Sequence, residues 1–360
     1  MTLFSRAVDV FLQRPTRTWA FSLHTGLPAR VSGYPVAVTS AALLFERDRV
    51  DEVDDWSHVV DHIGRKSILW IDLDRSEAQE IRHLGELLEL SSETTTRLES
   101  DDGQPYFGDF KSYLHTTAFA PTKQDGDAEP AKVDCLVAKQ WVVTVRDGDL
   151  EVFDEFRARM TESSGEVGLL DGPEFLAGLL EWMLEAYLGA FEAVELALEE
   201  FDERVMRGHH HDAEDELARL VAHRKHIGRL RRALVSHRSM FLALARPELE
   251  AITNSEHADH FQTLRGQLEE VVQVARDSRE AVFGSFDVLI ARSERRTNEI
   301  MKLLTLGTFI FLPGALLAGV MGMNFKVSFF ETTAYFRIVC TVIVAIAVSA
   351  STFARVRRSI

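Results

Sequence analysis

The sequence is poor in residues on which several protein classes depend. Only two of its 360 residues are cysteines, Cys135 and Cys340, and neither belongs to a Cys-x-x-Cys spacing. A disulfide framework and a cysteine-built zinc site are therefore excluded. The chain also lacks a Walker A loop, a GxGxxG after a strand, HExxH and GxSxG, so we expect that it is not an enzyme.

Basic residues are scarce as well. The chain has 40 lysines and arginines against 56 acidic residues, which gives a formal net charge of -16. Only five basic residues and one acid follow Lys302, so the first 302 residues carry 35 basic and 55 acidic groups. Nucleic acid needs a basic footprint and is excluded as a partner. An acidic surface instead concentrates cations, which are the partners that this charge favours.

Long uncharged runs occur only near the end of the chain. Residues 1–15 contain Arg6 and no long apolar core, so we expect no cleavable signal peptide there. Residues 303–325 form a run of 23 without a charge, and residues 338–354 form a second run of 17. The first is long enough to cross a bilayer core, and the second is at the short end of that range. Buried core helices are the alternative, but two such runs with a short connection favour a membrane hairpin.

The charges that flank the hairpin predict its orientation. Four basic residues precede the first run and three follow the second, while the connection 326–337 has only Lys326 and Arg337. The positive-inside rule then places both chain ends in the cytoplasm and the connection outside. The flanking basic residues are Arg292, Arg295, Arg296, Lys302, Arg355, Arg357 and Arg358.

Periodicity divides the rest of the chain into a mixed part and a helical part. Residues 68–71 and 141–145 are apolar runs that predict strands, and Ser76 is placed to cap the helix that follows the first run. After residue 171 the pattern predicts helices over 173–207 and 213–245, and a third from Asn254. We therefore expect a cytoplasmic α/β domain (1–170), a helical hairpin and stalk (171–302), two transmembrane helices (303–325 and 338–354) with an external loop (326–337), and a basic tail (355–360).

A stripe of polar and small residues recurs every three or four positions along the last long helix before Asn324. A dimeric coiled coil would carry leucine, isoleucine and valine at this period. Polar residues are costly in a membrane unless they face water, which several parallel helices sharing the stripe would enclose. The alternative is an ordinary polar seam between helices. The stripe comprises Glu280, Asp287, Ala291, Glu294, Asn298, Met301, Thr305, Thr308, Leu312, Ala315, Gly319, Gly322 and Asn324, and all of these except Glu280 and Ala291 are expected to line a pore.

The same region resembles the CorA family of divalent-cation channels. The similarity rests on the run 297–305, on Phe311-Leu312-Pro313, and on Gly322-Met323-Asn324-Phe325 at the outer end of the first span. The resemblance continues more faintly upstream, in 69–73 and 143–145.

This resemblance implies a funnel-shaped homopentamer. Each subunit would have an α/β/α cytoplasmic domain, a stalk helix and two C-terminal transmembrane helices in the inner cell membrane. The first spans would line a central pore, with Gly322, Met323 and Asn324 as its outer filter. Gly322, Asn324 and Asp287 would contact a transported cation through its waters. The cargo would be Mg²⁺, with Co²⁺ or Ni²⁺ also possible, and no cofactor is implied; the partners would be further copies of the chain, lipid and divalent ions.

Several positions depart from the family pattern. Lys326 puts a positive charge at the pore mouth, and the regulatory carboxylates of the stalk align with Thr263 and with a basic residue near Arg97. These differences admit a ZntB-type zinc transporter of the same architecture as the alternative, although that group usually has Gly-Val-Asn. Thirteen histidines, including His209–His211 and the pairs His223/His226 and His257/His260, suit zinc, or else are solvated helix and loop surface. A membrane-anchored scaffold without transport is a third possibility.

Overall fold

A computed structural model describes most of the chain. The described residues are 41–46, 49–53, 67–100, 103–122, 129–207, 213–246, 255–323, 337–338, 340–345, 348–349 and 352. The chain divides into two compact units, one of residues 1–204 and 209–285 and the other of residues 205–208 and 286–360.

The first unit is built on a seven-stranded mixed sheet. Its strands are β1 (Ala41–Glu46), β2 (Arg49–Glu52), β3 (Ile68–Asp74), β4 (Tyr106–Asp109), β5 (Leu114–Ala120), β6 (Ala131–Val137) and β7 (Trp141–Arg146). They lie in the order β2-β1-β3-β7-β6-β5-β4. Only the central pair β3 and β7 is parallel, with Leu69 opposite Trp141, and the other pairs are antiparallel. Both strands predicted from the sequence, 68–71 and 141–145, are therefore central strands of this sheet.

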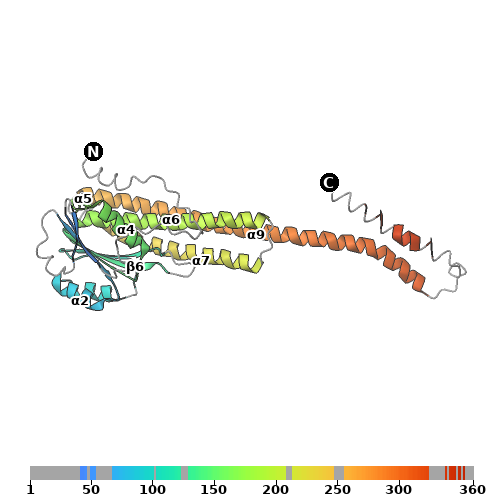
Figure 1. The fold of residues 1–360 in the computed structure, drawn as a ribbon, viewed down its shortest axis with the longest axis horizontal. Helices are drawn as coiled ribbons and strands as arrows, with labels where there is room; N and C mark the ends of the chain where they lie inside the picture. Colours follow the sequence, from blue (N-terminus) through green and yellow to red (C-terminus); the bar gives the residue numbers. More distant parts are fainter. Residues whose placement is uncertain are drawn as a thin grey trace. The chain divides into compact units, whose positions relative to one another are not determined.

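Helices cover both faces of the sheet, because both faces are apolar. Figure 1 shows α2 (Ala78–Leu87) on one side and α4 (Glu151–Glu162) with α6 (Gly172–Arg207) on the other. On the first side, Ile81 and Leu84 of α2 and Leu98 of α3 (Ser92–Glu99) pack on strand residues such as Ile71. On the second side, Trp70 contacts aromatic rings of α4 and α6 at centroid distances of 5.6 and 5.3 Å. The expected α/β/α arrangement is confirmed.

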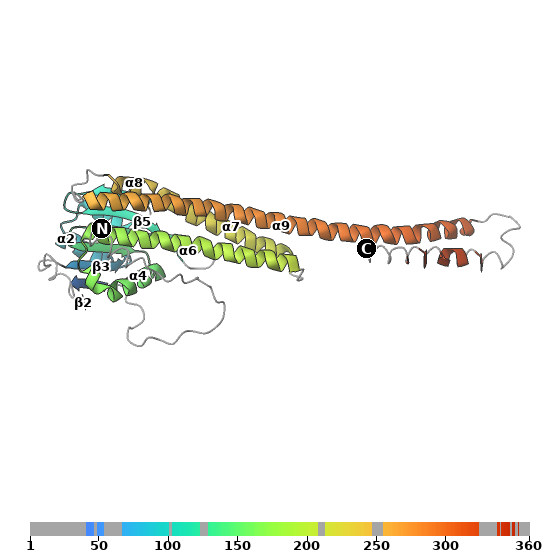
Figure 2. The same ribbon diagram turned by 90° about the horizontal axis from the view of Figure 1, so that it is seen from above.

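Three long helices pack together in the first unit. Figures 1 and 2 show α6, α7 (Ala213–Ser236) and the first part of α9 (Ser255–Gly322) side by side. Buried apolar residues of α9, among them Phe261, Leu264 and Leu268, recur every three or four positions and bring one face of the helix into the core. Polar pairs add to the contact: Gln267 donates to Glu181 at 3.1 Å, and Ser278 donates to Glu195 at 3.0 Å.

Two local predictions are wrong. Ser76 does not cap α2, whose N-cap residue is Glu77, because the Ser76 hydroxyl donates instead to Asp74 Oδ1 at 2.6 Å. The helix predicted over 213–245 is divided at His237 into α7 and α8 (Arg238–Leu244). The Nε2 atom of His237 accepts a hydrogen bond of 2.8 Å from the Phe119 backbone, which holds this buried ring against β5. Burial lowers the pKa of His237 to about 4, so the ring is neutral.

Candidate functional site

The part of α9 in the second unit is apolar and exposed. Between His257 and Val320, α9 contains an 18-residue window with a mean hydropathy of 2.0, none of which is buried. Large apolar side chains such as Phe309 and Phe311 are 74% and 76% exposed. Water does not favour such a surface, so it requires lipid or other protein around it.

One face of this segment is partly covered by the end of the same chain. The described pieces of 338–354 are helical, and a Cβ added to Gly314 would lie 3.4 Å from Ile343 Cγ2. The partly buried positions of this part of α9 recur at helical spacing and share one face of the helix with Gly314. They are Leu306, Gly307, Ile310, Pro313, Gly314 and Leu317.

The predicted pore stripe lies on the opposite face. Met301 and Gly319 stand nine residues before and after Ile310, which is about two and a half turns of an α-helix, and therefore point away from the covered side. Every described stripe residue is exposed in the single chain. The described members that we expect to line a pore are Asp287, Glu294, Asn298, Met301, Thr305, Thr308, Leu312, Ala315, Gly319 and Gly322, with Met323 following.

The two glycines of the stripe, Gly319 and Gly322, are not packed against another part of the described chain. Among the described residues, no atom of another element lies within 4 Å of a Cβ built on Gly319 or Gly322. Glycine inside a helix costs about 1 kcal/mol relative to alanine. Close approach of something outside the chain, or an open passage, would account for these glycines.

The threonine hydroxyl groups of the stripe are oriented so that their oxygens can accept hydrogen bonds. Thr305 donates its hydroxyl proton to the Met301 carbonyl at 2.8 Å, and Thr308 donates to the Leu304 carbonyl at 2.9 Å. Their oxygens therefore keep acceptor capacity for donors such as the waters of a hydrated cation. Asp287 and Glu294 add exposed carboxylates toward the first unit. The face changes from charged to neutral polar along α9.

Asn324 and Lys326 lie outside the described residues, as do His209–His211. The structure therefore describes ten of the eleven positions that we expect to line a pore, all on one face of α9, and the expected filter role of Asn324 stays a prediction.

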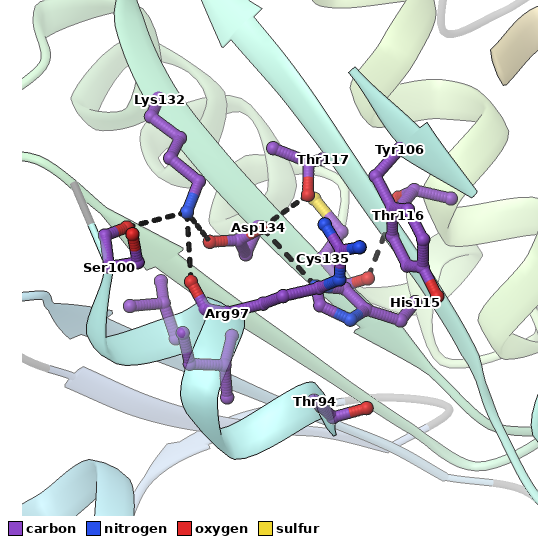
Figure 3. Close-up of polar contacts among 12 residues, drawn as sticks. Thr94, Arg97, Ser100, Tyr106, His115, Thr116, Thr117, Lys132, Asp134 and Cys135 are labelled. Carbon is purple, nitrogen blue, oxygen red and sulfur yellow. Dashed lines mark hydrogen bonds and ion pairs between the residues drawn. The ribbon is translucent and has the colours of Figure 1, made fainter. Parts of the chain in front are cut away.

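A second polar cluster lies inside the first unit, and sequence reasoning missed it. Figure 3 shows His115, Thr117 and Lys132 directed at Asp134, which is fully buried. Asp134 lies 2.9 Å from Arg75 Nη2 and 3.0 Å from Lys132 Nζ. Burial raises the pKa of Asp134, but hydrogen bonding and charge from His115, Lys132 and Thr117 outweigh burial and lower the pKa overall. The alternation of polar residues along β5 and β6 could have indicated this buried cluster, but the same pattern is typical of a strand with one exposed face.

The two positions that the resemblance predicts to align with regulatory carboxylates, Arg97 and Thr263, are not acidic. Arg97 stacks on the Tyr106 ring at 3.8 Å and pairs with Glu93 at 3.3 Å. Thr263 is exposed, and its hydroxyl donates to the Asp259 carbonyl at 3.0 Å.

Histidines predicted as solvated surface are largely withdrawn from solvent. His257 is buried, and His223, His226 and His260 are half-buried. Hydrogen bonding to Asp171 and Glu174 raises the pKa of His257 to about 9. Burial lowers the pKa of His223 and His226, which are therefore neutral at pH 7.

An α/β/α unit in the same chain as an exposed apolar helix that is long enough to cross a bilayer is typical of a membrane protein with a large extramembrane part. The family model described as "CorA-like Mg2+ transporter protein" matches residues 65–358, and the chain belongs to this family. The resemblance noted from the sequence is thereby confirmed.

Individual relatives are distant. The "Cobalt/magnesium transport protein CorA" of Thermotoga maritima is 22% identical over 219 residues, which cover 60% of this chain and 61% of that protein. The alignment thus spans about three fifths of that relative's length. The protein of the same description from Methanocaldococcus jannaschii is 20% identical over 72% of this chain and 80% of its own length.

Solved structures share the fold. The complete structure of the CorA magnesium transporter from Methanocaldococcus jannaschii superposes with a TM-score of 0.72 at 18% identity, covering 89% of this chain and 98% of that one. The ZntB cytoplasmic domain from Vibrio parahaemolyticus gives 0.55 at 13% identity, over 71% of this chain and 98% of its own. Both likenesses concern the fold alone.

Proposed function

We propose that the chain forms a divalent-cation channel that takes up Mg²⁺, with Co²⁺ and Ni²⁺ as further cargo, across the plasma membrane. The stripe on α9 would line a central pore between five copies. The observation that carries this proposal is that the described stripe residues are exposed and lie opposite the face of α9 on which Gly314 approaches Ile343, so that they stay open to other subunits. A lipid-facing helix would have no use for hydroxyls, an amide and glycines on that side.

The chemistry of the stripe suits a cation that keeps its waters. Mg²⁺ dehydrates reluctantly and retains several water ligands in protein sites. Threonine oxygens, the Asn298 amide and a ring of Asn324 amides can accept hydrogen bonds from those waters without replacing them. Conduction requires binding weak enough for release, which favours these neutral groups over carboxylates within the membrane. Met301 and Leu312 would form apolar constrictions that gate by dewetting.

The number of subunits in the proposed pore can be tested by measuring the mass of the assembly. Purified full-length protein in mild detergent is expected to be a pentamer by native mass spectrometry, since one polar stripe cannot enclose water alone. A monomer or dimer that retains its lipids would contradict the pore.

Charge at the pore mouth gives a second prediction. Lys326→Glu is expected to increase Mg²⁺ uptake several-fold at low external Mg²⁺ and low ionic strength, with little change at saturation. Five subunits would together change ten charges around one opening, and salt screens such charges beyond roughly 10 Å at about 0.1 M. Uptake into liposomes at two ionic strengths measures the effect, and Lys326→Gln should give about half of it. Equal uptake by all three proteins at low salt would place the 326–337 connection away from the pore.

Zinc is the alternative cargo. The count of 13 histidines favours it, whereas Gly322-Met323-Asn324 in place of Gly-Val-Asn favours magnesium. Flux of Mg²⁺, Co²⁺, Ni²⁺ and Zn²⁺ into the same liposomes distinguishes the two. Transport of none of them would favour a membrane-anchored scaffold.

A further inference from the structure

A cluster of one imidazole and two carboxylates lies in the first unit, where α6 and α9 begin. The Nε2 atom of His257 on α9 is 3.2 Å from Asp171 Oδ2 and 3.7 Å from Glu174 Oε1. The three potential ligand atoms all lie within 4.8 Å of one another. The His257 side chain is only 7% exposed, and Asp171 and Glu174 are partly buried.

The helix start of α6 fixes both carboxylates. The Glu174 backbone donates to Asp171 Oδ1 at 3.1 Å, and the Asp171 backbone donates to Glu174 Oε2 at 2.8 Å. This reciprocal capping occupies one oxygen of each acid. The other oxygens, Asp171 Oδ2 and Glu174 Oε1, are the two that face His257. The two capping hydrogen bonds would remain when an ion binds, whereas the ion would replace the contacts of His257 Nε2 with the two acids and displace the proton from the ring.

We propose that Asp171, Glu174 and His257 form a transition-metal site within each subunit, with Zn²⁺ as the best match and Co²⁺ or Ni²⁺ as close alternatives. Zinc binds histidine nitrogen and carboxylate oxygen at about 2.0–2.2 Å, so tetrahedral ligand atoms lie about 3.4 Å apart. The two His257 distances bracket that separation. Water completes the coordination. Imidazole is a ligand for zinc and nickel, while Mg²⁺ prefers oxygen, so the site selects against the proposed cargo.

The site would join the N-terminal ends of α6 and α9, which are 83 residues apart in the sequence, counted from Glu174 to His257. The inference goes beyond transport and does not rest on it, because binding is measured without flux.

Metal binding by the full-length protein tests the proposal. Detergent-purified protein stripped of metal is dialysed against Zn²⁺ in millimolar Mg²⁺, and bound zinc is counted per chain. We expect one tightly held Zn²⁺ in the wild type. His257→Ala and His257→Gln should each lower the affinity for Zn²⁺ at least tenfold. Mutation of a residue that only hydrogen-bonds to a metal ligand already lowers metal affinity about 10–100-fold.

His223→Ala is the matched control, because His223 is a half-buried histidine outside the cluster. It should keep the zinc. The glutamine variant can still hydrogen-bond to the acids, and thermal unfolding in the absence of metal confirms that it folds. Unchanged zinc binding in folded His257→Gln, or a zinc X-ray absorption spectrum without an imidazole shell, would overturn the assignment.

Discussion

Asn324→Ala is expected to lower Mg²⁺ uptake by at least tenfold while leaving the assembly intact. In the proposed pore, five amides form the ring of acceptors for a hydrated cation, and a methyl group cannot replace them. A hydrogen bond contributes about 1 kcal/mol net, so losing several from one ring exceeds the roughly 1.4 kcal/mol that corresponds to a factor of ten. Uptake into liposomes, normalised to reconstituted protein, gives the measurement.

Val320→Ala serves as the control for this change. Val320 is exposed on α9 but lies off the stripe, and its truncation removes apolar atoms without removing an acceptor. It should transport at nearly the wild-type rate, and both variants should have the native mass of the wild type. Equal transport by Asn324→Ala and the wild type would show that this amide is not part of the filter.

The second large effect concerns stability. Asp134→Asn should destabilise the first unit by about 3–5 kcal/mol, because it leaves the buried Lys132 ammonium without its carboxylate and leaves Arg75 with Asp147 alone. For a unit of this size that corresponds to a fall of roughly 10 °C in unfolding temperature. Thermal unfolding of the full-length protein, followed by circular dichroism, measures it.

The exposed pair of Glu46 and Arg49 supplies the control, since its 2.8 Å contact is open to solvent. Glu46→Gln should change stability by less than about 1 kcal/mol. The lowered pKa of Asp134 also fixes the sign of a pH effect. Its stabilisation is present above the unfolded pKa of about 3.9 and is lost as pH falls through the lower folded value. Asp134→Asn should therefore lose the part of the pH dependence of stability that comes from this carboxylate. If Asp134→Asn were as stable as the wild type, the stabilising role given to the Asp134 cluster would be wrong.

Local sequence patterns were sufficient to predict the helices and strands that are buried or amphipathic along their whole length. The apolar run 141–145 became β7, and the periodic stretch after residue 171 became α6. Contacts between distant residues were not predictable in this way. The helix divides at His237, whose ring bonds to the Phe119 backbone 118 residues away, and Ser76 bonds to Asp74 instead of capping α2.

The same distinction applies to the candidate functional residues. The common face of the described stripe residues was predictable because they share one helix and helical geometry orders them. The Asp134 cluster and the site around His257 each draw residues from several elements, so the sequence shows only scattered acids, lysines and histidines. The pair His257/His260 drew attention for its spacing, but its carboxylate neighbours at 171 and 174 appear only once the fold joins α6 to α9.

Accessibility of three consecutive positions tests the central claim, which is that the stripe faces water inside the membrane. In a Cys340→Ser background, Thr308→Cys lies on the stripe, Phe309→Cys on the exposed apolar side and Ile310→Cys on the face partly covered within the chain. With the protein in lipid vesicles, a small water-soluble cationic thiol reagent should modify Thr308→Cys rapidly and the other two slowly, and Mg²⁺ should slow the Thr308→Cys reaction. Equal protection of all three, or faster reaction at Phe309→Cys or Ile310→Cys, would contradict a water-filled pore along this face of α9.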